Sequence, residues 1–219
     1  FYEMGVSFDS DDAKKLNEKI FEHIYYGAVK RSMEISRDRS IKMNELKDKP
    51  ELVDPTALHI HGSIHKKVPH AKCILHVHSK YATALAALED PTLPPIDQNT
   101  MRFFNRVGVY RDFGGMGFEE ESEKMASKIG NKKVLLMSNH GVLTTGQTVA
   151  EAFDELYYFE RACETYITAL STQKKLKIVS DEVAEKTAQE WENFSTDAKD
   201  LHLKAIRSIL DKEDPSYKN

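Results

Sequence analysis

The chain has 219 residues, 40% of them apolar and 30% charged, and a formal net charge of −4. This length and composition suit one globular domain, which we expect to cover residues 1–219. The absence of a basic block argues against nucleic-acid binding, and no apolar run has the roughly 18–20 residues needed to cross a bilayer. Cys73 and Cys163 stand in apolar patterns. They therefore indicate reduced core thiols and a cytoplasmic protein without membrane partners.

The first quarter of the chain has weak periodicity; Phe1–Val6 resembles the end of a helix closed by Gly5, and a charged helix is expected over Asp11–Tyr26. The pattern becomes clearer further on, where apolar residues at helical spacing predict a helix from Pro55 to just before Pro69. His61 and His65 lie four residues apart in this helix. We therefore expect them to share one of its faces.

Strands and helices then alternate along the chain. The predicted strands cover Lys72–His78, Val107–Tyr110, Lys133–Ser138 and Val142–Thr145. The predicted helices cover Lys80–Leu88, Asp97–Phe104, Glu119–Ile129, Thr148–Leu170, Asp181–Ser195 and Thr196–Leu210, and the tail Asp211–Asn219 is expected to fray. Such alternation predicts an α/β fold in which helices cover a central sheet.

Two of the predicted strands end in histidines. His76 and His78 are separated by one residue, so the two-residue period of a strand sends both to the same face. The second strand runs into Ser138-Asn139-His140-Gly141. Neutral imidazole is a common ligand of zinc and similar divalent metals. Three histidines from two strand ends would leave one coordination position open, which favours a catalytic metal site over a closed structural one.

The other histidines have simpler interpretations. An isolated pair such as His76 and His78 is more often structural, but here several features agree on a metal. For His61 two interpretations stand near even: a fourth ligand or proton carrier beside the metal, or an imidazole packed against the sheet. His65 is interpreted as structural. Surface positions are expected for His23, His70 and His202. We assign Glu119-Glu120-Glu121 to a helix N-terminus, where the macrodipole favours acidic residues.

An ordered set of segments resembles the class II aldolase and adducin head-domain family. These segments are Leu58–His65, Ile74–Ser79, Ser138–Gly146, Glu151–Phe153 and Phe159–Cys163. The match covers residues 54–185, is closest to the adducin-like branch, and leaves residues 186–219 as C-terminal helices and tail. The resemblance implies a three-layer α/β/α sandwich around a mostly antiparallel sheet, assembled as a homo-oligomeric, ring-like tetramer. It also implies that His76, His78 and His140 bind a divalent metal, most often Zn²⁺, with Mn²⁺ or Fe²⁺ as alternatives.

The chain departs from this family where the proton carriers are expected. The aldolases use a glutamate on the helix before the His-x-His strand, and Ala57 stands at that position. The dehydratases use a glutamate after the strand, and the nearest match is Gln98-Asn99, so Asn99 supplies no acid. A phosphate-binding loop is not recognisable in residues 7–45. The predicted metal ligands are therefore present without the usual proton carriers.

Three functions are compatible with these residues. The first is a lyase that cleaves a carbon–carbon bond of a small hydroxy-carbonyl, sugar-phosphate-like substrate through a metal-stabilised enediolate. His61, one helical turn from Ala57, would then replace the family glutamate as the catalytic acid or base. The second is a metal-binding scaffold without turnover. The third is an adducin-like interaction module, the only reading under which actin would be a partner.

Overall fold

A four-stranded mixed sheet forms the centre of the computed structural model, which describes residues 55–115, 119–194, 196–213 and 215. The strands are β1 (Cys73–Val77), β2 (Val107–Tyr110), β3 (Val134–Met137) and β4 (Gly141–Gly146), in the order β1-β4-β3-β2. The β1–β4 and β4–β3 pairs are antiparallel, whereas β3 and β2 are parallel. Strand β4 therefore lies between β1 and β3, the two strands that end in predicted ligands, and its first residues pair with the ends of both.

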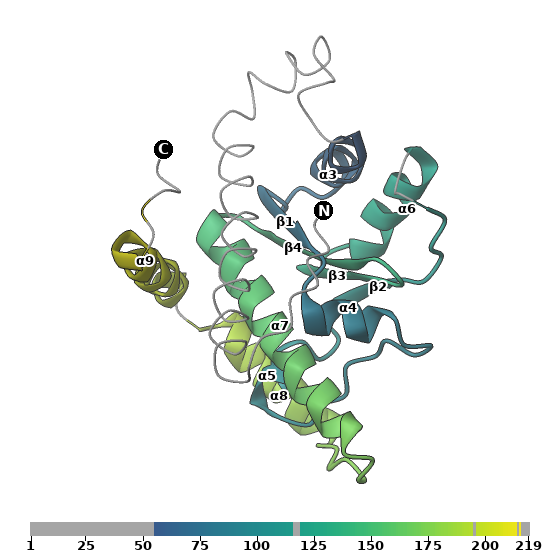
Figure 1. Ribbon diagram of the computed structural model, residues 1–219, viewed down its shortest axis with the longest axis vertical. Coiled ribbons are helices and arrows are strands. Elements are labelled where there is room, and N and C mark those ends of the chain that lie inside the picture. Colours follow the sequence, from purple (N-terminus) through teal and green to yellow (C-terminus); the bar gives the residue numbers. More distant parts are fainter. Residues whose placement is uncertain (1–54, 116–118, 195, 214, 216–219) are drawn as a thin grey trace, which may run out of the picture.

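Helices cover both faces of the sheet (Figure 1). The helices are α3 (Pro55–Lys67), α4 (Lys80–Ala86), α5 (Gln98–Arg102), α6 (Glu119–Ile129), α7 (Val149–Ser171), α8 (Asp181–Glu192) and α9 (Thr196–Glu213). Helices α3 and α6 pack together over one face, and α4 and α7 cover the other. Helix α5 packs against α7 and α8, and α9 packs against α7. The result is the expected three-layer α/β/α arrangement.

Side-chain alternation along the strands divides the core in two. Leu75 on β1 and Leu136 on β3 join the core under α4 and α7, whereas Ile74 and Leu135 join the core under α3 and α6. Every residue of β3 and β4 is buried. Strand β3 is a continuous apolar run because both faces of the sheet are covered by helices, whereas β4 also buries Thr144 and Thr145.

The expected element boundaries agree with the structure to within a few residues in most of the chain. One end was wrong: α9 runs to Glu213, so the residues from Asp211 to Glu213 are helical instead of frayed. Between Leu210 and Pro215 there is no proline or glycine to interrupt the helical backbone. The helix elements predicted at Phe1–Val6 and Asp11–Tyr26 lie outside the described residues. None of the described helices is long and apolar enough to span a membrane.

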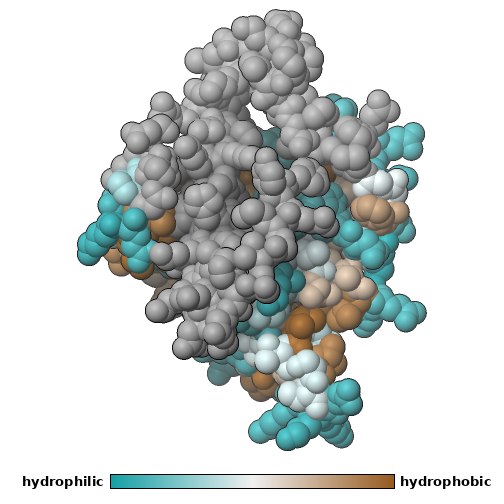
Figure 2. Space-filling view, viewed as in Figure 1, coloured by the Kyte–Doolittle hydropathy of each residue, from teal (hydrophilic) through white to brown (hydrophobic). Residues whose placement is uncertain are grey.

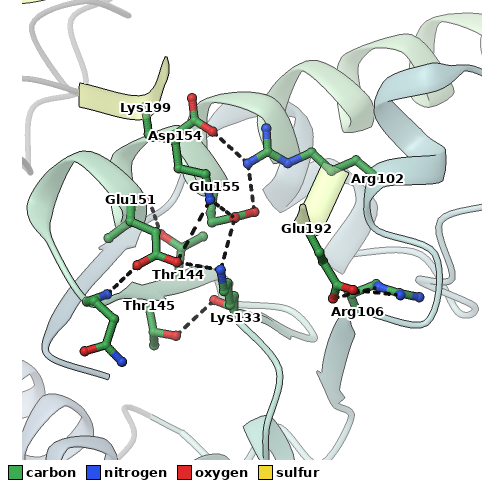
Figure 3. A network of polar contacts seen from close by, with 12 residues as sticks. Arg102, Arg106, Lys133, Thr144, Thr145, Glu151, Asp154, Glu155, Glu192 and Lys199 are labelled. Atoms are coloured by element: carbon green, nitrogen blue, oxygen red, sulfur yellow. Dashed lines mark hydrogen bonds and ion pairs between the residues drawn. The ribbon is translucent and has the colours of Figure 1, made fainter. Parts of the chain in front are cut away.

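A network of buried ion pairs joins the helices of the α7 face (Figure 3). The side chain of Arg102 is only 5% exposed and pairs with Asp154 at 2.7 Å and Glu155 at 3.1 Å. From α9, Lys199 reaches Glu155 at 3.4 Å and His202 contacts Asp154 at 2.8 Å. His202 was expected at the surface, but its pairing with Asp154 and its aromatic neighbours leave it only 19% exposed. These contacts hold α5 and α9 against α7.

Exposed apolar side chains remain on the outer surface. Leu201 and Ile209 of α9 are both exposed. On the face seen in Figure 2, hydrophobic colour shows at the place of α9, while much of the rest of the described margin is hydrophilic. The outer side of α9 therefore contributes little to the core, in contrast to its buried Leu203.

Candidate metal centre

Three imidazoles, those of His76, His78 and His140, gather beside the α3 and α6 face of the sheet. Their ring centroids are 5.0 Å apart for His76 and His78, 4.9 Å for His76 and His140, and 4.8 Å for His78 and His140. One ring nitrogen from each lies within 4.8 Å of the others. The structure thus brings together the three residues that the sequence nominated as ligands.

His76 is held by the sheet itself. It pairs with Leu143 in the β1–β4 register, and its Nδ1 lies 2.9 Å from the carbonyl oxygen of Val142. With Nδ1 donating to that carbonyl, the ring presents its Nε2 lone pair to the other imidazoles. A histidine ligand is commonly oriented by such a bond to a backbone carbonyl. The β1–β4 pairing therefore selects both the position of His76 and its tautomer.

His140 lies in the tight turn between β3 and β4. Asn139 has a φ of 57°, the left-handed conformation that asparagine tolerates better than most residues, and the backbone N–H of His140 donates to Met137 at 3.1 Å. Gly141 follows at a point of close approach: a Cβ there would lie 2.7 Å from Cδ2 of His78 and 2.7 Å from the Val77 carbonyl oxygen. The Asn-His-Gly sequence thus forms the turn and leaves room for His78.

All three imidazoles are favoured in their neutral form. Burial lowers the pKa of His76 from 6.5 to about 3, partly opposed by its bond to Val142, and the neighbouring His140 lowers it further. Burial also lowers the pKa of His78. Burial and the charge of His78 lower the pKa of His140, while the charge of Glu121 acts in the opposite direction. At neutral pH the lone pairs needed for ligation are therefore available.

The chemistry of this donor set fits a divalent metal ion. Among the described residues, the buried Nδ1 of His140 has no hydrogen-bond partner, and an unsatisfied buried polar atom is costly in an ordinary core. Each of the three neutral imidazoles can also offer one ring-nitrogen lone pair, and these nitrogens lie within 4.8 Å of one another. A cation that accepts nitrogen ligands would satisfy this arrangement, and three protein ligands would leave further positions for a substrate.

His61 lies close enough to the triad for its charge to lower the pKa of His76. Burial, with the neighbouring His65, lowers the pKa of His61 from 6.5 to about 4. His61 is therefore neutral at pH 7. His65 lies 2.7 Å from the Ala71 carbonyl through its Nδ1, which joins α3 to the start of β1 and agrees with the expected structural role. Ala57 belongs to α3, but its side chain lies outside the described atoms.

Sequence reasoning missed Glu121. It was assigned to a helix N-terminus, and it does lie in the first turn of α6. Its carboxylate also accepts a 2.8 Å hydrogen bond from the backbone of Gly114, and its charge acts on both His140 and Tyr110. The ring of Phe113 lies 6.3 Å from that of His140. Glu121 thus connects the loop before α6 to the triad, a relation that no local sequence pattern indicates.

Asn99, the other expected proton-carrier position, lies in the first turn of α5, whose partners are α7 and α8. Asp97 caps this helix through the backbone of Thr100, and the Thr100 hydroxyl bonds back to the backbone of Asp97. The polar residues of this segment therefore serve the start of the helix. His70, expected at the surface, is partly buried and contacts the Lys132 carbonyl at 3.0 Å.

Comparison with known families agrees with this fold and site. Residues 26–167 match the family described as Class II Aldolase and Adducin N-terminal domain, which is more than half of the chain. The chain belongs to this family.

Its relatives include both aldolase-like proteins and adducins. A putative aldolase class 2 protein from Caulobacter vibrioides is 28% identical over 163 residues, covering 74% of this chain and 62% of the relative. Human beta-adducin is 31% identical over 152 residues, covering 64% of this chain but 20% of the adducin. The chain thus spans less than two thirds of these relatives, and their similarity leaves its branch within the family open.

Solved structures share the fold. An aldolase II superfamily protein from Pseudomonas syringae has a TM-score of 0.70 and 27% identity, with 76% of this chain and 67% of that chain covered. L-fuculose 1-phosphate aldolase from Glaciozyma antarctica has a TM-score of 0.62 and 25% identity, with 74% of this chain and 61% of that one covered.

Proposed function

We propose that this protein is a divalent-metal-dependent lyase that cleaves a carbon–carbon bond in a small hydroxy-carbonyl substrate of the sugar-phosphate type. The observation that carries the proposal is the convergence of His76, His78 and His140, with the buried Nδ1 of His140 lacking a partner among the described residues. Family membership and the similarity to a sugar-phosphate aldolase support it. Zn²⁺ is the proposed ion, with Mn²⁺ or Fe²⁺ as alternatives.

Different residues would bind the metal ion, hold its ligands in place and line the site. His76, held by Val142, and His140, held by the β3–β4 turn, would ligate the ion together with His78. A bound divalent metal supplies Lewis acidity that polarises a substrate carbonyl. Phe113, close to His140, offers an apolar surface that shields one side of the site from water.

Two side chains are proposed to hold or move the proton. His61 remains the prediction from the sequence; being neutral at pH 7, it can accept a proton but retains it weakly. Glu121 supplies a carboxylate on the other side of the triad, near His140. We expect His61→Gln and Glu121→Gln to differ: loss of the true proton carrier lowers kcat about 10²–10⁴-fold while metal content stays constant.

The first test is elemental analysis of the purified protein beside His76→Ala and a matched control, His65→Ala. We expect about one metal per chain in the wild type and in the control, and none in His76→Ala, because His76 belongs to the converging triad, whereas His65 does not and its Nδ1 contacts the Ala71 carbonyl. Stoichiometric metal in His76→Ala would reject the ligand assignment. A metal-loaded wild type that cleaves no sugar phosphate or hydroxy-keto acid would reject the lyase.

The second candidate is a metal-binding, adducin-like scaffold without turnover. It is favoured by Ala57, which cannot transfer a proton, and by the 31% identity to human beta-adducin. Actin would be a partner only under this alternative. A cytoplasmic homo-oligomer, tetrameric by resemblance, without nucleic-acid or membrane partners, is proposed under both functions. Bound metal without turnover on any member of the substrate panel would favour the scaffold.

A further inference from the structure

Glu160 of α7 is a buried carboxylate, 1% exposed, that lies next to the segment carrying His78. It accepts three hydrogen bonds from one short stretch of chain. The Ser79 hydroxyl donates to Oε2 at 2.6 Å, the Ala82 backbone to Oε2 at 2.9 Å, and the Tyr81 backbone to Oε1 at 2.8 Å. All three donors stand within four residues of His78, although Glu160 is about 80 positions away in sequence.

These bonds replace the usual cap of a helix. Ser79 occupies the N-cap position of α4, where a serine oxygen ordinarily accepts from the second or third backbone N–H of the helix, but its side chain makes no such bond. Glu160 accepts from both of those N–H groups and from the serine hydroxyl. The carboxylate also opposes the positive end of the helix dipole. The first turn of α4 is therefore anchored to α7 through one side chain.

His78 depends on this anchor more than the other two histidines do. His76 pairs within β1 and bonds to Val142, and His140 lies in a hydrogen-bonded turn. His78 follows the last residue of β1, and no hydrogen bond joins its ring to another residue of the described part. Gly141 lies close to the backbone of His78, and Ser79 follows His78 in the chain.

We infer that Glu160 is a positioning residue of the metal site, which fixes the strand-to-helix turn so that the imidazole of His78 meets those of His76 and His140. Its carboxylate bonds to Ser79, Tyr81 and Ala82 and not to the triad, so it acts through the backbone beside His78. The inference rests on the proposed metal site. Ligands of a metal must be held to within about 0.5 Å by their supporting residues, and the bonds of Glu160 to Ser79, Tyr81 and Ala82 restrain the backbone that follows His78.

The test compares Glu160→Gln with Glu164→Gln on the full chain. Glutamine presents an N–H₂ group where an acceptor is needed, whereas Glu164 lies one turn further along α7 and pairs only with Arg161 in the described structure, at the surface. Zn²⁺ affinity is measured by chelator competition at a temperature where circular dichroism shows both variants folded. We expect Glu160→Gln to bind about 10–100-fold more weakly than wild type and Glu164→Gln to be unchanged.

A second variant and a metal-free measurement separate positioning from a purely structural cap. Ser79→Ala removes one of the three donors, so it should weaken Zn²⁺ binding by a smaller factor, and its effect should nearly vanish in the Glu160→Gln background. In the metal-free protein, NMR signals of the His78 imidazole should shift in Glu160→Gln and not in Glu164→Gln. Should Glu160→Gln fail to fold, Ser79→Ala carries both measurements.

The outcomes are distinct. Wild-type affinity and unshifted His78 signals in Glu160→Gln, with only a lower melting temperature, would overturn the positioning role and leave the metal site intact. Failure of the wild type to bind Zn²⁺, Mn²⁺ or Fe²⁺ would overturn the proposed function. In that case the His78 signals alone would decide whether Glu160 orients this side chain.

Discussion

The ionisable groups on the two faces of the sheet differ in whether they are paired with a group of opposite charge. On the α7 face, cations around a cavity of about 250 Å³ have carboxylate partners: Arg102 with Asp154, Arg106 with Glu192 and Lys199 with Glu155, as Figure 3 illustrates. On the α3 and α6 face, three imidazoles meet each other, and one buried ring nitrogen lacks a partner in the described structure.

The contrast separates groups that support the fold from groups that await a ligand. The arginines that line the α7-face cavity have their charge matched by carboxylates, although the buried Nη1 of Arg102 and Nε1 of Trp191 have no hydrogen-bond partner among the described residues. The three neutral imidazoles, in contrast, offer lone pairs that a bound metal ion would accept. The state of pairing, more than the number of charged residues, distinguishes the candidate site from the network.

The largest effect on metal binding should come from removing a histidine of the triad, compared with removing a histidine on the α7 face. We expect His140→Ala to lose metal binding by more than the roughly 10–100-fold typical of an outer-shell partner, because a ligand itself is removed. His202→Ala should retain wild-type affinity and lose about 1–3 kcal/mol of stability, since Asp154 loses a partner. Chelator competition and urea unfolding measure the two quantities. Equal metal affinity in both variants would erase the distinction between the faces.

Breaking the network should destabilise without affecting the metal. Arg102→Ala leaves Asp154 and Glu155 buried without their cation, and we expect a loss of about 3–5 kcal/mol in unfolding free energy. Lys186→Ala, at an exposed pair on α8, should change little. A folded Arg102→Ala with normal stability would show that the network is dispensable; Arg102→Lys serves as the milder variant for calorimetry.

Two glycines allow a test with opposite signs. Gly141→Ala places a Cβ 2.7 Å from both the His78 ring and the Val77 carbonyl. We expect it to cost about 1–3 kcal/mol and to weaken metal binding by displacing His78. At Gly62 in α3 a Cβ meets nothing within 4 Å, so Gly62→Ala should stabilise by about 0.5–1 kcal/mol. Thermal unfolding with and without Zn²⁺ compares them, and a neutral Gly141→Ala would contradict the close approach.

The last comparison concerns pH. Burial lowers the pKa of His61 to about 4, so the unfolded chain takes up the proton first and stability falls as pH drops below 6.5. Between pH 6.5 and 5 the metal-free wild type should lose about 1–2 kcal/mol more than His61→Gln. On the other face, burial raises but the bonds from His202 and Arg102 lower the pKa of Asp154, with a net decrease. That contribution is lost only below about pH 4. If the unfolding free energies of the wild type and His61→Gln fell equally between pH 6.5 and 5, the predicted contribution of His61 would be refuted.

Local patterns were sufficient for much of the fold. Alternation in Cys73–Val77 placed His76 on one face, and the turn sequence ending at Gly141 placed His140 at a strand end. The helices followed from apolar spacing, although Thr148, predicted as the first helical residue, is the N-cap of α7 and accepts the backbone N–H of Glu151. Periods of two and 3.6 residues act over short distances, so a single sequence displays them directly.

Other relations joined residues too far apart for any period to reveal. The parallel pairing of β2 with β3 depends on how the intervening helix α6 crosses the sheet. The partners of Asp154, 48 and 52 positions away, and the loop bonded to Glu121 were likewise invisible locally. His202 was therefore expected at the surface and Glu121 at an ordinary helix start, and both expectations missed their tertiary partners.

The sequence by itself determined which elements form and which histidines end the strands, because backbone propensity and side-chain alternation are local. Only the tertiary structure decided that three imidazoles converge, that their burial favours the neutral form, and that Glu160 reaches the turn after His78. The pKa shifts arise from desolvation and the Glu160 contacts from hydrogen bonds between distant segments, so both exist only once the helices have packed against the sheet.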